Sequence, residues 1–222
     1  MFKLVGFVTA AVMSFAPVFA AAQGTPGAAL RPVQGQTIIS SELPAAQFTF
    51  GKEFRYVGSQ RLNLYGTADA EQHLFARSAK NGTVERFYWV QFEHFYATNT
   101  YTYDYPADHT TRFADLKFVY DVKSFPDYAA GQREDPKSDG AAIARLLAEH
   151  NLAFPRRAAR VRMFHLPTPD RRSEVMIIYG EALPDNSAVP VRLGGVDLEK
   201  EAPAFAGRMV ERARKDLTIH PR

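Results

Sequence analysis

The sequence predicts an α+β fold, a curved antiparallel sheet of about seven to eight strands with one mid-chain helix and a C-terminal helix packed on it. Short runs of aromatic and β-branched residues dominate the chain from Phe48 to Tyr105. Helical spacing of apolar residues occurs in two later segments. Strand and helix do not alternate regularly and no Gly-rich phosphate loop is present, which argues against a doubly wound nucleotide-binding fold.

The predicted strands are short, and turn residues bound most of them. In chain order they are Phe48–Val57, Arg61–Tyr65, Glu71–Ala79, Val84–Tyr96, Tyr101–Tyr105, Asp115–Val122, Ala159–Leu166 and Glu174–Leu183. Residues 124–137 contain two prolines and a glycine and predict a loop.

Two helices are predicted from apolar residues that recur at helical spacing. The first spans Asp139–His150 with Ser138 as its N-cap. Its buried face carries Ile143, Leu146, Leu147 and His150. The second follows Asp197 and runs to about Leu217. Its regular part is expected to start at Pro203, because proline is tolerated in the first turn of a helix.

The N-terminus has the layout of a secretory signal peptide over residues 1–22. Lys3 supplies a positive start, and the mostly apolar stretch Leu4–Phe15 follows. As a helix that stretch would span roughly 18 Å, against about 30 Å for the core of a bilayer. Cleavage after Ala20 or Ala22 fits the small-residue rule, and Ala22 is preferred. We therefore expect a periplasmic or secreted protein that is not an integral membrane protein after cleavage.

The rest of the chain divides into a leader and one domain. Residues 23–36 are rich in glycine and proline and predict a flexible leader, which leaves 37–222 as a single α+β domain. The sequence contains no cysteine, so disulfides, thiolate nucleophiles and cysteine-ligated metals are excluded. A formal net charge of +3 gives no reason to expect a nucleic-acid partner. The residues identify no cofactor and no metal-binding motif.

The dipeptide Asn81-Gly82 predicts a two-residue type I′ turn between two strands. Lys80 then pairs with Thr83, and the register that follows places two sets of side chains on one sheet face. The aromatic set is Phe75, Tyr88 and Phe92, and the titratable set is Asp69, Glu71, His73 and His94. One pair conflicts with this register, because Arg77 lies opposite Arg86. Either these side chains splay apart or a bulge shifts the pairing.

Both faces of this hairpin are largely apolar, so both are expected to be covered. One face would pack on the helices, and the other would line a cavity for an apolar or aromatic small molecule or a lipid. The predicted ligand-binding residues are Phe75, Tyr88, Val90, Phe92 and Tyr96. His73 and His94 would serve as further polar handles.

Two other functions remain open from the sequence, which does not decide whether the protein is an enzyme. A hydrolase or isomerase would use a histidine base oriented by a carboxylate. Its candidate catalytic residues are His94, His73, Asp69 and Glu71. A cell-envelope interaction protein would instead bind an anionic component through a basic strand. The arginines of that strand and its turn are Arg160, Arg162, Arg171 and Arg172, and the alternative is a solvated strand edge.

Overall fold

The computed structural model describes residues 30–222. The signal peptide predicted over 1–22 and residues 23–29 of the predicted leader lie outside the described residues. Residues 30–36 differ from the prediction of a flexible leader, because Val33–Gln34 forms strand β1 and pairs with strand β2 (Thr37–Ser40). None of the helices described between residues 30 and 222 has the length and apolar character needed to cross a membrane.

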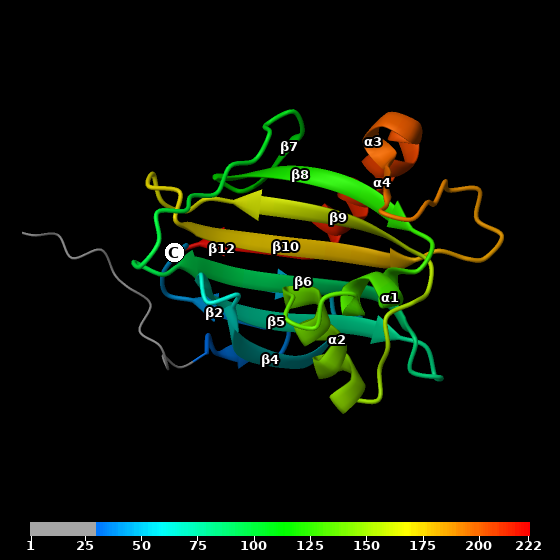
Figure 1. Cartoon of the computed structure of the whole chain (residues 1–222), viewed down its shortest axis with the longest axis horizontal. Helices are drawn as coiled ribbons and strands as arrows, with labels where there is room; N and C mark the ends of the chain where they lie inside the picture. Colours follow the sequence, from blue (N-terminus) through cyan, green and yellow to red (C-terminus); the bar gives the residue numbers. More distant parts are fainter. Residues whose placement is uncertain (1–29) are drawn as a thin grey trace, which may run out of the picture.

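Two antiparallel sheets make up most of the fold (Figure 1). The eight-stranded sheet has the order β11-β8-β9-β10-β6-β5-β4, with β7 also paired to β8, and the four-stranded sheet has the order β1-β2-β3-β12. The large sheet contains β4 (Arg55–Leu64), β5 (Ala68–Ser78), β6 (Val84–Phe95), β7 (Thr110–Phe113), β8 (Leu116–Phe125), β9 (Ala158–His165), β10 (Ser173–Ala182) and β11 (Val196–Asp197). The small sheet adds β3 (Ala46–Phe50) and β12 (Leu217–Pro221) to β1 and β2. The helices are α1 (Tyr128–Arg133), α2 (Asp139–Glu149), α3 (Leu198–Glu201) and α4 (Pro203–Lys215).

Each face of the large sheet has its own apolar core, since side chains alternate between the faces of a strand. On one face, the small sheet and α4 pack against aromatic residues of β5 and β6. On the other, α1 and α2 pack against residues such as Trp89 and Ile178. Figure 1 shows α1 and α2 over this second face. Tyr103 and Tyr105, from the segment between β6 and β7, lie over the same face, because they contact Glu93 and Phe164.

The predicted α+β class with an antiparallel sheet, a mid-chain helix and a C-terminal helix is confirmed. The large sheet is less curved than predicted. It is open, and its outer strand β4 does not pair with β7 or β11 (Figure 1). The second sheet was not predicted. Three of its four strands, β1, β2 and β12, lie outside every predicted strand and have two, four and five residues. Strands this short carry too few residues for a periodic pattern to be visible.

Several predicted boundaries need correction. The predicted strand Phe48–Val57 is two strands, because the chain turns between Phe50 and Arg55 and passes from the small sheet to the large one. Tyr101–Tyr105 is not a strand, although Tyr103 and Tyr105 are well packed. The region 124–137 contains helix α1, which the loop prediction missed. Helix α2 and its N-cap agree with the sequence: Ser138 Oγ accepts a hydrogen bond from Ala141 N at 3.1 Å. His150, which was predicted on the buried face, is exposed because the helix ends at Glu149.

The register of the β5–β6 hairpin is confirmed from Asp69↔His94 to Arg77↔Arg86, but the turn that produces it differs from the prediction. Gly82 has a positive φ of 83°, whereas Asn81 does not, so the turn is not type I′. Gly82 N instead donates to Ala79 O at 3.0 Å. Pairing next to the turn is displaced by one residue, and a bulge between Arg77 and Ser78 restores the predicted register.

The like charges of this hairpin are neutralised locally. Arg77 Nε donates to Glu85 at 2.8 Å, and Arg86 Nη1 donates to Asp216 at 2.9 Å. Arg86 also lies 3.2 Å from Glu53. The two guanidinium groups therefore point to different acids, and their opposition across the strands is tolerated.

Candidate functional site

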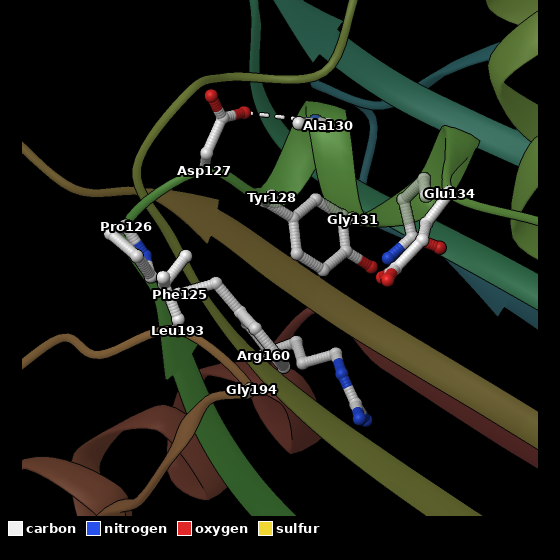
Figure 2. Close-up of a pocket in the computed structure, with 11 residues that line it drawn as sticks. Phe125, Pro126, Asp127, Tyr128, Ala130, Gly131, Glu134, Arg160, Leu193 and Gly194 are labelled. Atoms are coloured by element: carbon white, nitrogen blue, oxygen red, sulfur yellow. Dashed lines mark hydrogen bonds between the residues drawn. The ribbon is translucent and has the colours of Figure 1, made fainter.

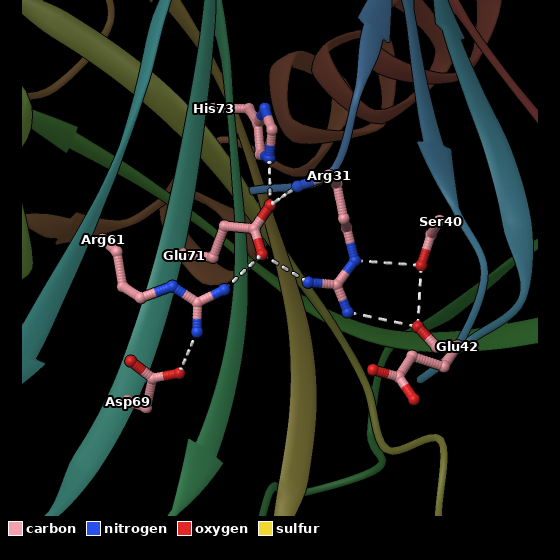
Figure 3. Close-up of polar contacts among 7 residues, drawn as sticks. All are labelled: Arg31, Ser40, Glu42, Arg61, Asp69, Glu71 and His73. Carbon is pink, nitrogen blue, oxygen red and sulfur yellow. Dashed lines mark hydrogen bonds and ion pairs between the residues drawn. The ribbon is translucent and has the colours of Figure 1, made fainter. Parts of the chain in front are cut away.

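Three of the predicted titratable residues form an ion-pair network, the Glu71 network, between the large sheet and the N-terminal segment (Figure 3). Glu71 Oε1 lies 2.7 Å from His73 Nε2 and accepts from Arg31 N at 2.5 Å. Its Oε2 accepts from Arg31 Nη1 at 2.6 Å and from Arg61 Nη2 at 3.2 Å. Arg61 also pairs with Asp69. The carboxylate–imidazole pair predicted as Glu71 and His73 is thus brought together.

The Glu71–His73 pair is shielded from solvent. The side chains of His73 and Glu71 are 0% and 2% exposed. Burial favours a higher pKa for Glu71, but the hydrogen bond from His73 and the charge of Arg31 outweigh it and leave the pKa below its usual range. His73 Nδ1 is buried and has no hydrogen-bond partner within residues 30–222. Both carboxylate oxygens are occupied, so the network ties the segment around Arg31 to β5.

The remaining candidate base, His94, lies apart from this network. Its Nδ1 is 2.8 Å from Ser173 Oγ on the neighbouring strand β10. Asp69 is its register partner across β5, but that carboxylate is engaged by Arg61. Burial, with a smaller contribution from the charge of Arg172, lowers the pKa of His94. The structure therefore does not join His94 to a carboxylate.

The predicted ligand wall lies inside the core between the two sheets. Phe75, Tyr88 and Val90 are fully buried, and Phe92 is 5% exposed. Their partners are aromatic residues of the small sheet and its connection to β4, including Phe48 against Phe92 and Phe54 against Tyr88. Tyr96 follows the end of β6 and is half-buried. None of the five lines the pocket described below.

The predicted basic strand is also divided. Arg160 and Arg162 extend from β9 and share the carboxylate of Asp121. Arg171 and Arg172 lie in the β9–β10 connection and hold the segment after β6. Arg171 pairs with Asp104, and Arg172 Nη2 donates to Tyr96 O at 2.8 Å. Every one of these guanidinium groups has a partner within the chain.

A pocket of about 600 Å³ lies where β8 ends and α1 begins, and we call it the β8–α1 pocket (Figure 2). It is lined by Phe125, Pro126, Asp127, Tyr128, Ala130, Gly131, Gln132, Glu134, Arg160, Leu193 and Gly194. Local sequence shapes two of its sides. Asp127 caps α1 by accepting from Ala130 N at 2.8 Å. A turn brings Leu193 to the pocket, and at Gly195 of that turn a Cβ atom would lie 2.8 Å from Phe125, so glycine is required.

Tyr128 forms the inner wall of this pocket. Its ring is held by Phe154 at 5.1 Å, Phe125 at 5.5 Å and Phe87 at 5.9 Å between centroids. The residue is 1% exposed, and its hydroxyl has no hydrogen-bond partner within residues 30–222. Burial raises the pKa of Tyr128 to about 12, against the opposing charge of Arg160. A buried hydroxyl without a partner costs about 1–3 kcal/mol.

Buried acids lie deeper on the same sheet face. Glu93 and Glu174 are 8% and 4% exposed, and burial raises the pKa of both carboxyls, that of Glu174 to about 8. Glu93 accepts from Tyr103 Oη at 2.7 Å, and Tyr105 donates to Glu174. Burial also raises the pKa of Asp139, the first residue of α2. Among the described residues, no group of three His or acidic side chains is arranged to hold a metal ion.

Sequence reasoning missed the β8–α1 pocket for a physical reason. Its residues come from the 125–134 region, from β9 and from the turn before β11, so no short motif contains them. One local signal was present: Asp127 is a good N-cap residue and begins a short helical segment. The arginine prediction did include one lining residue, Arg160.

Comparison with known proteins assigns no family to this chain. It matches no protein-family model, no curated protein and no solved structure. Its function is therefore inferred from its own residues.

Proposed function

We propose that this chain is an exported protein that binds a small apolar or aromatic molecule in the β8–α1 pocket. The observation that carries the proposal is an open volume of about 600 Å³ whose lining includes the apolar residues Phe125, Pro126 and Leu193. Leu193, one of them, is 90% exposed. Small-molecule sites typically occupy about 300–1,000 Å³ and are lined mainly by apolar and aromatic side chains.

The shape of the mouth supports this function. Phe125, Pro126 and Leu193 lie together at one side of the pocket, while Gly131 leaves room at the helix (Figure 2). A ligand seated there would cover the side chain of Leu193, which is otherwise exposed to water. Removal of that surface from water favours binding by about 25 cal/mol per Å².

A neutral fluorescent probe, phenylnaphthylamine, tests this proposal directly. Its fluorescence rises when it leaves water, so a titration of the purified protein gives an affinity. The decisive variant is Gly131→Trp, because a Cβ atom at Gly131 meets nothing within 4 Å and the indole can fill the pocket. We expect this variant to bind the probe at least about tenfold more weakly, the equivalent of 1.4 kcal/mol.

The matched control is Gly207→Trp. Gly207 lies in α4, a Cβ atom there also meets nothing within 4 Å, and the residue is not part of the pocket. This control is expected to bind as the unmodified protein does. Equal affinity in both variants, or no binding by the unmodified protein, would remove the pocket as a binding site.

A further inference from the structure

Two arginines of β9 share one carboxylate unequally. Arg162 donates to Asp121 Oδ2 through Nε at 3.1 Å and through Nη2 at 2.8 Å. Arg160 makes one long contact, from Nη1 to Asp121 Oδ1 at 3.3 Å. The other donors of the Arg160 guanidinium have no hydrogen-bond acceptor within residues 30–222. Arg160 therefore keeps donor capacity that a guanidinium typically uses to bind an oxyanion.

A second group in the β8–α1 pocket has the same requirement. The Tyr128 hydroxyl is buried and lacks an acceptor within the described chain. Arg160 and Tyr128 both line the pocket, and in Figure 2 the polar ends of both side chains point away from Pro126 at its mouth. One acceptor group at this inner end would satisfy a hydroxyl and a guanidinium together.

We propose that the ligand of the β8–α1 pocket carries an oxyanion, such as a carboxylate or sulfonate, that accepts hydrogen bonds from Tyr128 and Arg160. This inference rests on the proposed binding function and adds the charge class of the ligand. The apolar body of the ligand would lie outward, against Phe125 and Leu193. The molecule is therefore an amphiphilic or aromatic acid.

Two acidic residues of the pocket affect where in it an anion can bind. Asp127 and Glu134 also line it, and both are exposed. Asp127 is already used to cap α1. Asp127 lies on the side of Pro126 and repels an anion at the mouth, whereas Glu134 lies at the end to which the Tyr128 hydroxyl points and opposes the attraction of Arg160 for an anion there (Figure 2).

Two probes with the same ring system separate this inference from the binding function. Phenylnaphthylamine is neutral, and anilinonaphthalene sulfonate adds one sulfonate to the same aromatic skeleton. For each probe, only the part of the binding that Gly131→Trp abolishes is attributed to the β8–α1 pocket and compared. We expect the sulfonate to bind about tenfold more tightly than the neutral probe, the size of one charge-assisted hydrogen bond.

Tyr128→Phe is the central variant, because it removes only an oxygen that has no partner in the chain and so retains the fold. It is expected to weaken sulfonate binding about fivefold to tenfold and to leave the neutral probe unchanged. Glu134→Gln, at an exposed position, is expected to strengthen sulfonate binding alone. Arg160→Gln is expected to abolish the preference for the sulfonate.

The outcomes are distinct. Equal affinity for the two probes, or equal weakening of both by Tyr128→Phe, overturns the oxyanion and leaves the pocket as an apolar binding site. Failure of both probes to bind overturns the binding function and this inference with it. A preference for the sulfonate that persists in Tyr128→Phe and in folded Arg160→Gln places the anion elsewhere and also overturns the inference.

Discussion

Glu93 and Glu174 are register partners on β6 and β10, and both carboxyl groups are buried on the same face of the large sheet. Each accepts a hydrogen bond from a tyrosine of the segment between β6 and β7, Glu93 from Tyr103 and Glu174 from Tyr105. Two adjacent buried carboxylates repel each other, so one of them keeps its proton at neutral pH. This pair fastens a segment without regular structure onto the sheet.

Glu174→Gln is expected to stabilise the protein at neutral and alkaline pH. Burial and the charge of Glu93 raise the pKa of Glu174 to about 8 in the folded protein, against an ordinary value of 4.5. The folded state then binds the proton more tightly, so stability falls as pH rises from about 4.5 and the loss is complete above about 8. At roughly 1.4 kcal/mol per pKa unit, the cost reaches about 5 kcal/mol at most.

Urea unfolding at pH 5, 7 and 9 checks this expectation. The difference in free energy of unfolding between Glu174→Gln and the unmodified protein should grow from pH 5 to pH 9. The control is Glu85→Gln, because the Glu85 side chain is 41% exposed. A difference that stays constant with pH would contradict the raised pKa of Glu174.

Tyr103→Phe is expected to destabilise the protein by about 1–3 kcal/mol, because Glu93 would lose a hydrogen bond while remaining buried. The matched control is Tyr101→Phe, since Tyr101 is 57% exposed. Its effect should lie within about 0.5 kcal/mol. Thermal unfolding of both variants measures the difference, and equal melting temperatures would argue against the Tyr103–Glu93 bond.

Glu71→Gln is expected to lower the free energy of unfolding by about 3 kcal/mol, because it removes one side of a buried ion pair and leaves Arg31 without its counterion. Glu85→Gln breaks an exposed pair with Arg77 and should cost less than about 1 kcal/mol. Denaturant unfolding compares the two. Equal losses would show that the Glu71 network contributes no more than a surface ion pair.

The same network has a pH signature. The pKa of Glu71 is lowered in the folded protein, so the contribution of Glu71 to stability is fully present above its ordinary pKa of 4.5 and is lost as pH falls through the lower folded value. Relative to the intrinsic exchange rate at each pH, amide protection in β1 and β2 should therefore fall at acid pH more than protection in β10. A uniform fall across the three strands would contradict a local role for Glu71.

Export predicts a defined mature N-terminus. Protein recovered from the periplasm or medium should begin at Gln23, as measured by intact mass, because small residues end at Ala22. A start at Ala21 would instead mean cleavage after Ala20. Val8→Asp interrupts the apolar stretch and is expected to prevent cleavage. Recovery of the unmodified protein with residues 1–22 attached would contradict the signal peptide.

The β5–β6 hairpin illustrates how far a local pattern carries. Its register follows from the position of Asn81-Gly82 and the alternation of side chains, and the structure confirms it past the bulge at Arg77. The predicted turn type was wrong. The turn is accompanied by a bulge, which depends on the pairing of the two strands next to the turn and not on the dipeptide alone. The faces were assigned correctly, but what covers each face was not visible from the hairpin.

The site shows the same division. Glu71 and His73 are two residues apart on one strand, so their shared face follows from strand geometry. Arg31, which completes the network, comes from a glycine- and proline-rich region that has no pattern of its own. Likewise Tyr128, Arg160 and Leu193 are far apart in the chain, and only their packing makes a pocket.

By itself, the sequence determined the α+β class, the hairpin register, the N-cap of helix α2 and three of the four residues predicted for its buried face, because each depends on residues close together in the chain. The tertiary structure decided that the strands divide into two sheets and that Phe75 and Tyr88 meet the small sheet. It also decided that an open volume remains beside Tyr128. These features depend on which distant segments cover a given face, and burial is a property of that contact and not of the local pattern.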